Sequence, residues 1–266
     1  MNTTLPRILC AAAAATLVLA PSLLGAQAKP DASTSGTLNV NASLSHKVIP
    51  NYAASEVYAS IKIEAREFVS EARAPLNIAL VIDRSGSMAG DKIAQARQAA
   101  ARLVDTLGPK DRLSIVTYSS DVDVMVTSLP VTDANKATFH KAISGLTPDG
   151  FTFLSGGFDK GCELVSNTIQ EGSVNRVILM SDGQANRGVT SVGALERKAE
   201  ACLNKGVSLT TIGLGLDYNE ALMAQMARAG AGNYHFVEDE RSMARVFETE
   251  AKGLTTTVAK KTNLVI

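Results

Sequence analysis

The spacing of apolar residues differs between two parts of the chain. Residues 38–44 and 57–64 alternate apolar and polar side chains, which is the two-residue period of half-buried β-strands. Residues 76–82 (LNIALVI) instead form an unbroken apolar run, as in a strand covered on both faces of a sheet. The pattern therefore predicts a small β-strand appendage over residues 37–73 and a larger domain over residues 74–254.

Strands and helices alternate through this larger domain. Apolar residues recur at helical spacing in residues 92–107, 135–144, 155–169, 192–205, 219–228 and 241–254. Apolar runs predict further strands at residues 113–118, 122–127, 176–180, 207–213 and 233–237. The short link before residue 122 allows an antiparallel hairpin but no parallel crossover. The prediction is an α/β fold, a doubly wound and mostly parallel sheet with helices on both faces.

The N-terminus shows the pattern of an export signal. One positive charge, Arg7, precedes an apolar stretch over residues 8–24, and residues 26–28 (AQA) supply the small side chains of a cleavage site. We therefore predict a signal peptide over residues 1–28 and an exported protein, located in the periplasm, at the cell surface or in the medium. No membrane span is expected after cleavage, and an uncleaved membrane anchor is the alternative.

Two short segments flank the predicted domains. Residues 29–36 are small and polar and are predicted to be a linker. Residues 255–266 end in the apolar sequence NLVI, which has the character of a strand. This strand either returns to the β appendage or begins a segment that continues in a longer chain.

Charge excludes one class of partner. The chain has 26 Lys and Arg against 26 Asp and Glu, so its formal net charge is zero, and no basic run occurs. A nucleic-acid-binding surface needs clustered positive charge, so we expect no nucleic-acid partner.

The candidate chemistry lies in three loops of the larger domain. The pattern D-x-S-x-S follows the first buried strand, and two further loops follow at the same predicted sheet edge. Ligands of open α/β sheets bind beyond the carboxyl ends of the strands. Together the loops offer two carboxylates and three hydroxyls, from Asp83, Ser85, Ser87, Thr152 and Asp182. These hard oxygen ligands suit Mg²⁺, Mn²⁺ or Ca²⁺ and are poor ligands for copper or structural zinc.

Four segments carry a family resemblance. LVIDRSGSM, TPDGFTFLSGGF, VILMSDGQANRG and VSLTTIGLG resemble, in that order, the successive blocks of a von Willebrand factor A (vWA) domain over residues 74–254. The resemblance implies the Rossmann-like vWA fold with a metal-ion-dependent adhesion site (MIDAS). The positions of that site are matched one by one by Asp83, Ser85, Ser87, Thr152 and Asp182. It further implies a non-enzymatic adhesion or assembly role, in which the ion coordinates a Glu or Asp carboxylate of a partner protein.

One loop departs from the family pattern. Members commonly carry Gly and Asn beside the metal-site Thr, whereas Thr152 is flanked by Phe151 and Phe153. One of these rings can pack beneath the loop. An exposed one would be an apolar anchor beside the ion, so both are candidate partner-binding residues.

Two cysteines remain once the signal peptide is removed. Cys162 and Cys202 both fall in predicted helices, and disulfides persist in oxidising compartments. The vWA resemblance places those helices side by side on one face of the sheet, which implies a disulfide. The alternative is two buried free thiols.

Enzymatic readings lack essential residues. Phosphatases of the haloacid dehalogenase type need a second Asp two residues after the first, where this chain has Ser85. Neither Ser85 nor Ser181 stands in the G-x-S-x-G turn of a serine hydrolase. The three histidines lie outside the metal loops. We therefore expect no enzyme; the alternatives to a metal-dependent binding module are a metal-free structural scaffold and a metal-dependent hydrolase.

Overall fold

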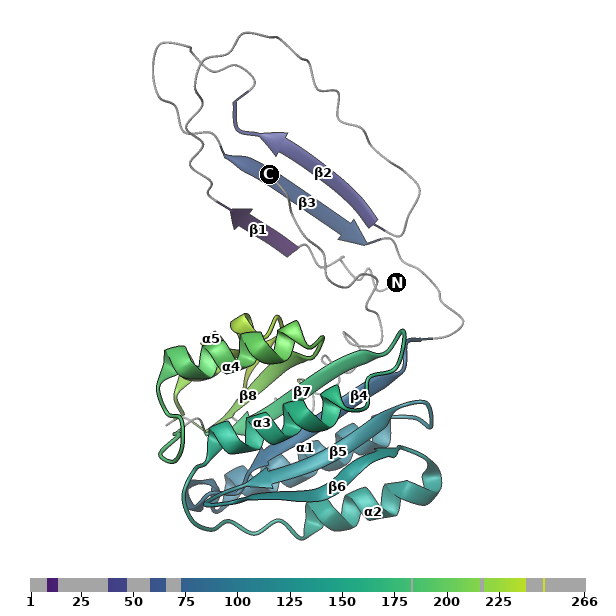
Figure 1. Cartoon of the computed structure of the whole chain (residues 1–266), viewed down its shortest axis with the longest axis vertical. Coiled ribbons are helices and arrows are strands. Elements are labelled where there is room, and N and C mark those ends of the chain that lie inside the picture. Colours follow the sequence, from purple (N-terminus) through teal and green to yellow (C-terminus); the bar gives the residue numbers. More distant parts are fainter. Residues whose placement is uncertain are drawn as a thin grey trace, which may run out of the picture. The chain divides into compact units, whose positions relative to one another are not determined.

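The chain divides into two compact units, Met1–Glu71 with Val258–Ile266, and Ala72–Thr257. The computed structural model describes residues 9–13, 38–46, 58–65, 73–182, 184–215, 218–237 and 246 (Figure 1). The predicted linker at residues 29–36 and the predicted C-terminal strand lie outside the described residues.

The smaller unit contains a three-stranded antiparallel sheet in the order β1-β3-β2. The strands β2 (Leu38–Leu44) and β3 (Ala59–Ala65) lie where the alternating pattern predicts them, which confirms the β appendage. β1 (Leu9–Ala13) falls within the predicted signal peptide and pairs with β3. Cleavage of residues 1–28 stays a prediction.

The larger unit is built on a six-stranded sheet in the order β6-β5-β4-β7-β8-β9, counted over the described residues. The strands are β4 (Leu76–Asp83), β5 (Arg112–Tyr118), β6 (Val122–Pro130), β7 (Val174–Ser181), β8 (Ser208–Leu214) and β9 (Tyr234–Val237). Only the β5–β6 pair among them is antiparallel, as the short link predicts. The chain runs from β4 outward to one side and returns to β7 on the other, so the order reverses between β4 and β7. This is the position at which doubly wound sheets bind ligands.

Helices cover both faces of this sheet. They are α1 (Asp91–Thr106), α2 (Asp133–Ser144), α3 (Leu154–Ser166), α4 (Val192–Asn204) and α5 (Glu220–Ala229). Alternate side chains of β4 enter two separate cores, with Leu80 packing on the α1 and α2 side and Val81 on the side of α3, α4 and α5. Figure 1 shows α3 lying across one face and α1 behind the sheet. The doubly wound, mostly parallel α/β fold is confirmed.

The third helix is shorter than predicted. The apolar pattern extends to residue 169, whereas α3 ends at Ser166. The hydroxyls of Ser166 and Thr168 donate to the carbonyls of Cys162 (2.6 Å) and Leu164 (2.9 Å), and such side-chain bonds compete with continuation of a helix. Of the helix predicted at residues 241–254, only residue 246 is described, and it is helical.

A disulfide joins Cys162 of α3 to Cys202 of α4, with the two Cα atoms 6.0 Å apart. It lies in the core between the sheet and these helices. The predicted pairing is confirmed.

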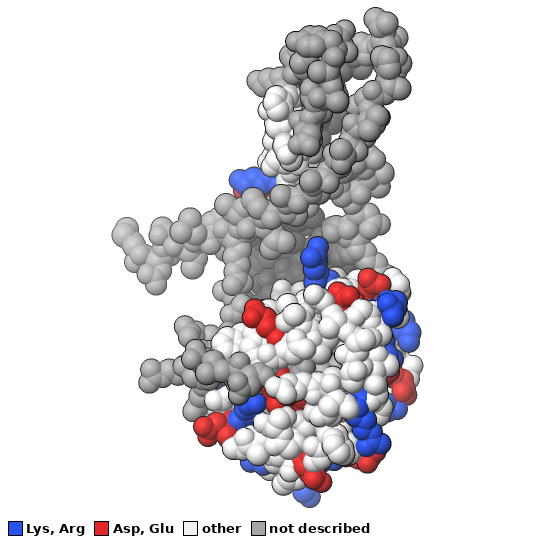
Figure 2. Space-filling model, turned by 90° about the vertical axis from the view of Figure 1, so that its left-hand side faces the viewer, with Lys and Arg blue, Asp and Glu red and all other residues white. Residues whose placement is uncertain are grey.

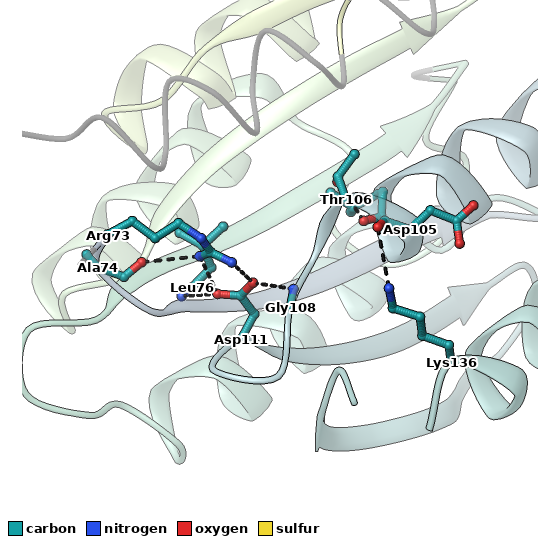
Figure 3. A network of polar contacts seen from close by, with 9 residues as sticks. Arg73, Ala74, Leu76, Asp105, Thr106, Gly108, Asp111 and Lys136 are labelled. Atoms are coloured by element: carbon teal, nitrogen blue, oxygen red, sulfur yellow. Dashed lines mark hydrogen bonds and ion pairs between the residues drawn. The ribbon is translucent and has the colours of Figure 1, made fainter. Parts of the chain in front are cut away.

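A buried carboxylate anchors the segment that leads into β4 (Figure 3). Asp111 accepts hydrogen bonds from the backbone of Leu76 (2.9 Å) and Gly108 (2.8 Å), and its two oxygens accept from both terminal nitrogens of Arg73. Burial alone would raise the pKa of Asp111, but these donors outweigh it and hold the pKa below its ordinary value. The start of the sheet is thereby tied to the loop before β5.

Candidate metal centre

Two carboxylates meet at the point where the strand order reverses. Asp83 is the last residue of β4, and Asp182 follows the last residue of the adjacent parallel strand β7. Both side chains are fully buried. One oxygen of Asp83 accepts from the backbone N–H of Ser85 (2.8 Å) and the other from the hydroxyl of Ser181 (2.6 Å). The two parallel strands thus deliver one acid each to the same edge.

These acids lie in a setting that favours a bound cation. Burial raises the pKa of Asp83 to about 6; the hydrogen bonds from Ser181 and Ser85 lower it and the negative charge of Asp182 raises it. The Oδ1 atom of Asp182 is buried and has no hydrogen-bond partner among the described residues. A buried carboxylate oxygen without a partner is costly unless a ligand completes it. The pair therefore fits a divalent ion.

The two serines of D-x-S-x-S stand beside Asp83. The short 3₁₀ helix η1 (Gly86–Met88) turns the chain so that the hydroxyls of Ser85 and Ser87 lie 3.1 Å apart. Ser85 is buried whereas Ser87 is exposed. The cluster of oxygens therefore opens to solvent on the side of Ser87.

The loop that carries Thr152 is hydrogen-bonded to the loop that follows β4. The N–H of Gly86 donates to the carbonyl of Gly150 (3.1 Å), and the N–H of Asp149 donates to the carbonyl of Arg84 (2.7 Å). Gly150 has a φ of +71°, and a Cβ there would lie 2.4 Å from the hydroxyl oxygen of Ser120. Only glycine suits this position, where the two loops meet.

Asn186 fixes the backbone of Thr152 from the third loop. Its side-chain oxygen accepts from the Thr152 N–H (2.8 Å), and its own N–H donates to the Thr152 carbonyl (3.2 Å). Thr152 itself is buried. The geometry thus brings all five predicted ligand residues to one edge of the sheet, within three loops that are hydrogen-bonded to one another.

The two aromatic residues beside Thr152 differ in their surroundings. The ring of Phe153 packs against the backbone of Gly156 and Gly188, and the guanidinium of Arg187 lies 5.6 Å from its centroid. Phe151 is 62% exposed. Phe153 is only partly buried, so of the two candidate anchors Phe151 offers the larger exposed apolar surface.

Comparison with known proteins identifies the family. The von Willebrand factor type A domain matches residues 77–249, which is most of the chain. The chain belongs to the vWA family. It is 31% identical over 202 residues to the uncharacterized protein YfbK of Escherichia coli K12, covering 75% of this chain and 35% of that protein. It is 30% identical over 185 residues to bovine inter-alpha-trypsin inhibitor heavy chain H4, covering 65% of this chain and 20% of that one.

Solved vWA structures share the fold at lower identity. A vWA protein from Catenulispora acidiphila has a TM-score of 0.66 at 19% identity and covers 84% of this chain and 51% of its own. The vWF domain of the type V pilus tip protein Mfa5 from Porphyromonas gingivalis has a TM-score of 0.59 at 16% identity and covers 73% of this chain and 99% of its own. A mussel byssus protein with a zinc-occupied MIDAS motif has a TM-score of 0.54 at 21% identity, covering 68% and 46%.

The chain spans about a third or less of the curated vWA relatives named above. What those longer proteins do as wholes therefore does not transfer directly to this chain. Domains of this family are commonly protein-interaction modules, and that coarser description applies here.

Three residues of the candidate site were not predicted from the sequence. Ser181 bonds Asp83, Asn186 fixes Thr152, and the ammonium of Lys92 lies 3.2 Å from Asp182 Oδ2. Ser181 and Asn186 flank Asp182 in the segment SDGQANRG, so their neighbourhood was a usable signal. No local sequence signal pointed to Lys92, because its partner Asp182 lies 90 residues away in the chain. Among the described residues no group of three or more His, Cys, Asp or Glu could hold a metal ion.

Proposed function

We propose that this chain is a divalent-metal-dependent protein-binding module of an exported protein. Asp83, Ser85, Ser87, Thr152 and Asp182 hold Mg²⁺, with Mn²⁺ or Ca²⁺ as the other candidates. Some of these ligands act through water. The ion then coordinates a Glu or Asp carboxylate of a partner protein, and the role is adhesion or assembly.

The buried acid pair is the observation that carries this proposal. Asp83 and Asp182 are fully buried at one edge of the sheet, and one oxygen of Asp182 has no hydrogen-bond partner among the described residues. Two carboxylates balance a divalent charge, and neutral hydroxyls leave the ion electrophilic. Because Mg²⁺ prefers six ligands and rarely takes all of them from protein, a position stays open for a partner.

The surroundings of the site suit a protein partner. Figure 2 views the larger unit from the left of Figure 1, the side on which β5 ends, and shows a broad uncharged area with charged side chains scattered around it. Interface centres are depleted in charge and enriched in aromatic residues. Phe151 supplies an exposed ring in the loop of the proposed ligand Thr152. A coordinated carboxylate with an apolar contact beside it can dominate a small interface.

Relatives and the disulfide support export and a binding role. Mfa5 is a pilus tip protein, and the mussel protein has a zinc-occupied MIDAS motif. The Cys162–Cys202 disulfide suits an oxidising compartment. No helix among the described residues is both long and apolar enough to cross a membrane. The periplasm, the cell surface and the medium are all consistent with these features.

The decisive experiment is a calorimetric titration of the purified, chelator-treated protein with Mg²⁺, Mn²⁺ and Ca²⁺. We expect saturable binding at one site, and loss of that binding in Asp83→Asn. The amide keeps the size of the side chain and one oxygen, but it removes the charge that attracts the ion. Asp149→Asn is the matched control, because Asp149 is an exposed acid in the same loop as Thr152 and should leave binding unchanged.

The outcomes separate the proposed functions. Binding that is lost in Asp83→Asn and retained in Asp149→Asn supports the metal-dependent module. If the folded protein binds none of the three ions, the metal mechanism is wrong and a metal-free scaffold replaces it.

A further inference from the structure

A lysine of the chain already contacts one of the proposed metal ligands. Lys92 lies in the first turn of α1, and its ammonium is 3.2 Å from Asp182 Oδ2. The carboxylate is 0% exposed and the lysine side chain 23%, so the contact is partly shielded from water. Such a pair is stronger than one on the open surface, where ion pairs contribute little.

The backbone holds the lysine in this place. Gly215 follows the end of β8, and a Cβ at this glycine would lie 2.6 Å from Cε of Lys92. The aliphatic stem of the lysine therefore lies directly against the Gly215 backbone. The position of the ammonium follows from the fold and is not the chance position of a free surface side chain.

Two neighbouring basic residues are directed elsewhere. Arg84 pairs with the exposed Asp123 (2.8 Å), and Arg187 pairs with the exposed Asp121 (3.6 Å). Lys92 is the basic residue that forms an ion pair with a proposed ligand, among the ion pairs of the described residues. It neutralises one oxygen of Asp182, and the other, Oδ1, has no hydrogen-bond partner within the described part of the chain.

We propose that Lys92 is the internal counter-cation of this site. Its ammonium compensates Asp182 when no ion is bound, and its positive charge opposes the binding of a divalent ion at the other oxygen of the same carboxylate. This inference rests on the proposed function, because it concerns the same metal site. Lys92 therefore acts on the ion through Asp182, as a residue that tunes the site and not as a ligand.

Two opposite effects follow from this arrangement. Without metal, the ion pair stabilises a buried acid that would otherwise lie beside Asp83 uncompensated. With metal, the ammonium repels the arriving ion, because the two cations share one carboxylate. Compared with the same site without this charge, Lys92 thus makes the metal-free fold more stable and the affinity for metal weaker.

The test is Lys92→Met, which keeps the apolar stem and removes the charge. We expect Mg²⁺ or Mn²⁺ to bind about tenfold more tightly in calorimetry, the scale of one unit charge near an ion in a partly shielded site. In excess chelator the same variant should melt at a lower temperature than the unsubstituted protein. A merely structural lysine would lower the melting temperature without tightening the metal affinity.

Two further variants keep the test sharp. Lys198→Met removes a lysine from an exposed ion pair with Asp159, which joins α4 to α3 outside the three loops, and should change neither metal affinity nor the metal-induced rise in melting temperature. Lys92→Gln retains a donor for Asp182 without a charge. It should bind the metal more tightly with a smaller loss of metal-free stability, and it replaces Lys92→Met if that variant does not fold.

Each outcome supports or overturns the inference. Tighter metal binding together with lower metal-free stability in the variants supports it. Unchanged or weaker binding in the variants, beside normal binding in the unsubstituted protein, overturns it and leaves the proposed function intact. If the unsubstituted protein does not bind metal, the proposed function fails and the inference falls with it.

Discussion

At the scale of single residues, the site places two acids where a globular protein ordinarily avoids them. Asp83 and Asp182 are fully buried, and the nearby donors only partly compensate them. Burying a carboxylate without a full set of partners destabilises the folded state. The proposed ion would remove this cost. The same carboxylate oxygens therefore destabilise the metal-free fold and would bind the ion.

The raised pKa of Asp83 predicts how stability depends on pH without metal. Between about pH 4 and 6 the folded chain holds this proton and the unfolded chain does not, so folding stability should fall as pH rises through this range. A pKa of about 6 in place of about 4 corresponds to a loss of up to roughly 3 kcal/mol. Urea unfolding in chelator at pH 4 to 7.5 measures this loss.

The variant Asp83→Asn isolates this contribution, because it carries no titrating proton at that position. In chelator at pH 7 it should be more stable than the unsubstituted protein, and the fall in stability between pH 4 and 6 should shrink. If the variant is less stable at pH 7, the hydrogen bonds that Asp83 accepts from Ser85 and Ser181 stabilise the fold by more than burial of its charge destabilises it.

At the scale of elements, the closeness of α3 to the sheet positions Thr152. This helix begins two residues after Thr152, and its Gly161 lies against Val81 of β4, where a Cβ would be only 2.5 Å from Val81 Cγ2. Both partners are buried, and Val81 lies two residues before Asp83 on its strand. The missing side chain therefore sets the distance between the helix and the strand that carries the first ligand.

Substituting this glycine should disturb both packing and the site. In Gly161→Ala the new methyl pushes α3 away, and overpacking of this kind costs about 1–3 kcal/mol, more than the roughly 1 kcal/mol that alanine gains in a helix. Metal affinity should also fall, because Thr152 moves with α3. Gly193→Ala in α4 is the matched control, since the nearest side-chain atom is 3.7 Å away. It should leave stability unchanged or slightly raised in thermal denaturation.

The periodicity of apolar residues predicted most elements because each depends on its own pattern. The helix predicted at residues 92–107 is α1, Asp91–Thr106. The strand predicted at 122–127 runs on to Pro130 because Ser128 is held by a partner strand, its N–H donating to the hydroxyl of Ser114 (3.0 Å). The contact of Lys92 with Asp182 likewise joins two positions far apart in the chain, so no local pattern predicts it.

At the scale of the whole molecule, the disulfide closes a loop of 40 residues between α3 and α4. Cross-linking a loop of this length stabilises a fold by about 4 kcal/mol, chiefly by restricting the unfolded chain. In the double variant Cys162→Ala, Cys202→Ala the free energy of unfolding, measured in urea, should be lower by several kcal/mol. A reducing agent should lower the free energy of unfolding of the unsubstituted protein by a similar amount. The same agent should not affect the double variant, which lacks the disulfide.

When a chain is pulled at its two ends, the tension passes through its covalent bonds. The Cys162–Cys202 disulfide gives this tension a path that does not run through the backbone between the two cysteines. Strand β7 and Asp182 both lie between these cysteines, so once the unit unravels the load passes from α3 to α4 and bypasses them. About 130 Å of extended chain is withheld from the stretched molecule. The segment bearing one of the two acids is thus mechanically unloaded as long as the disulfide stays oxidised.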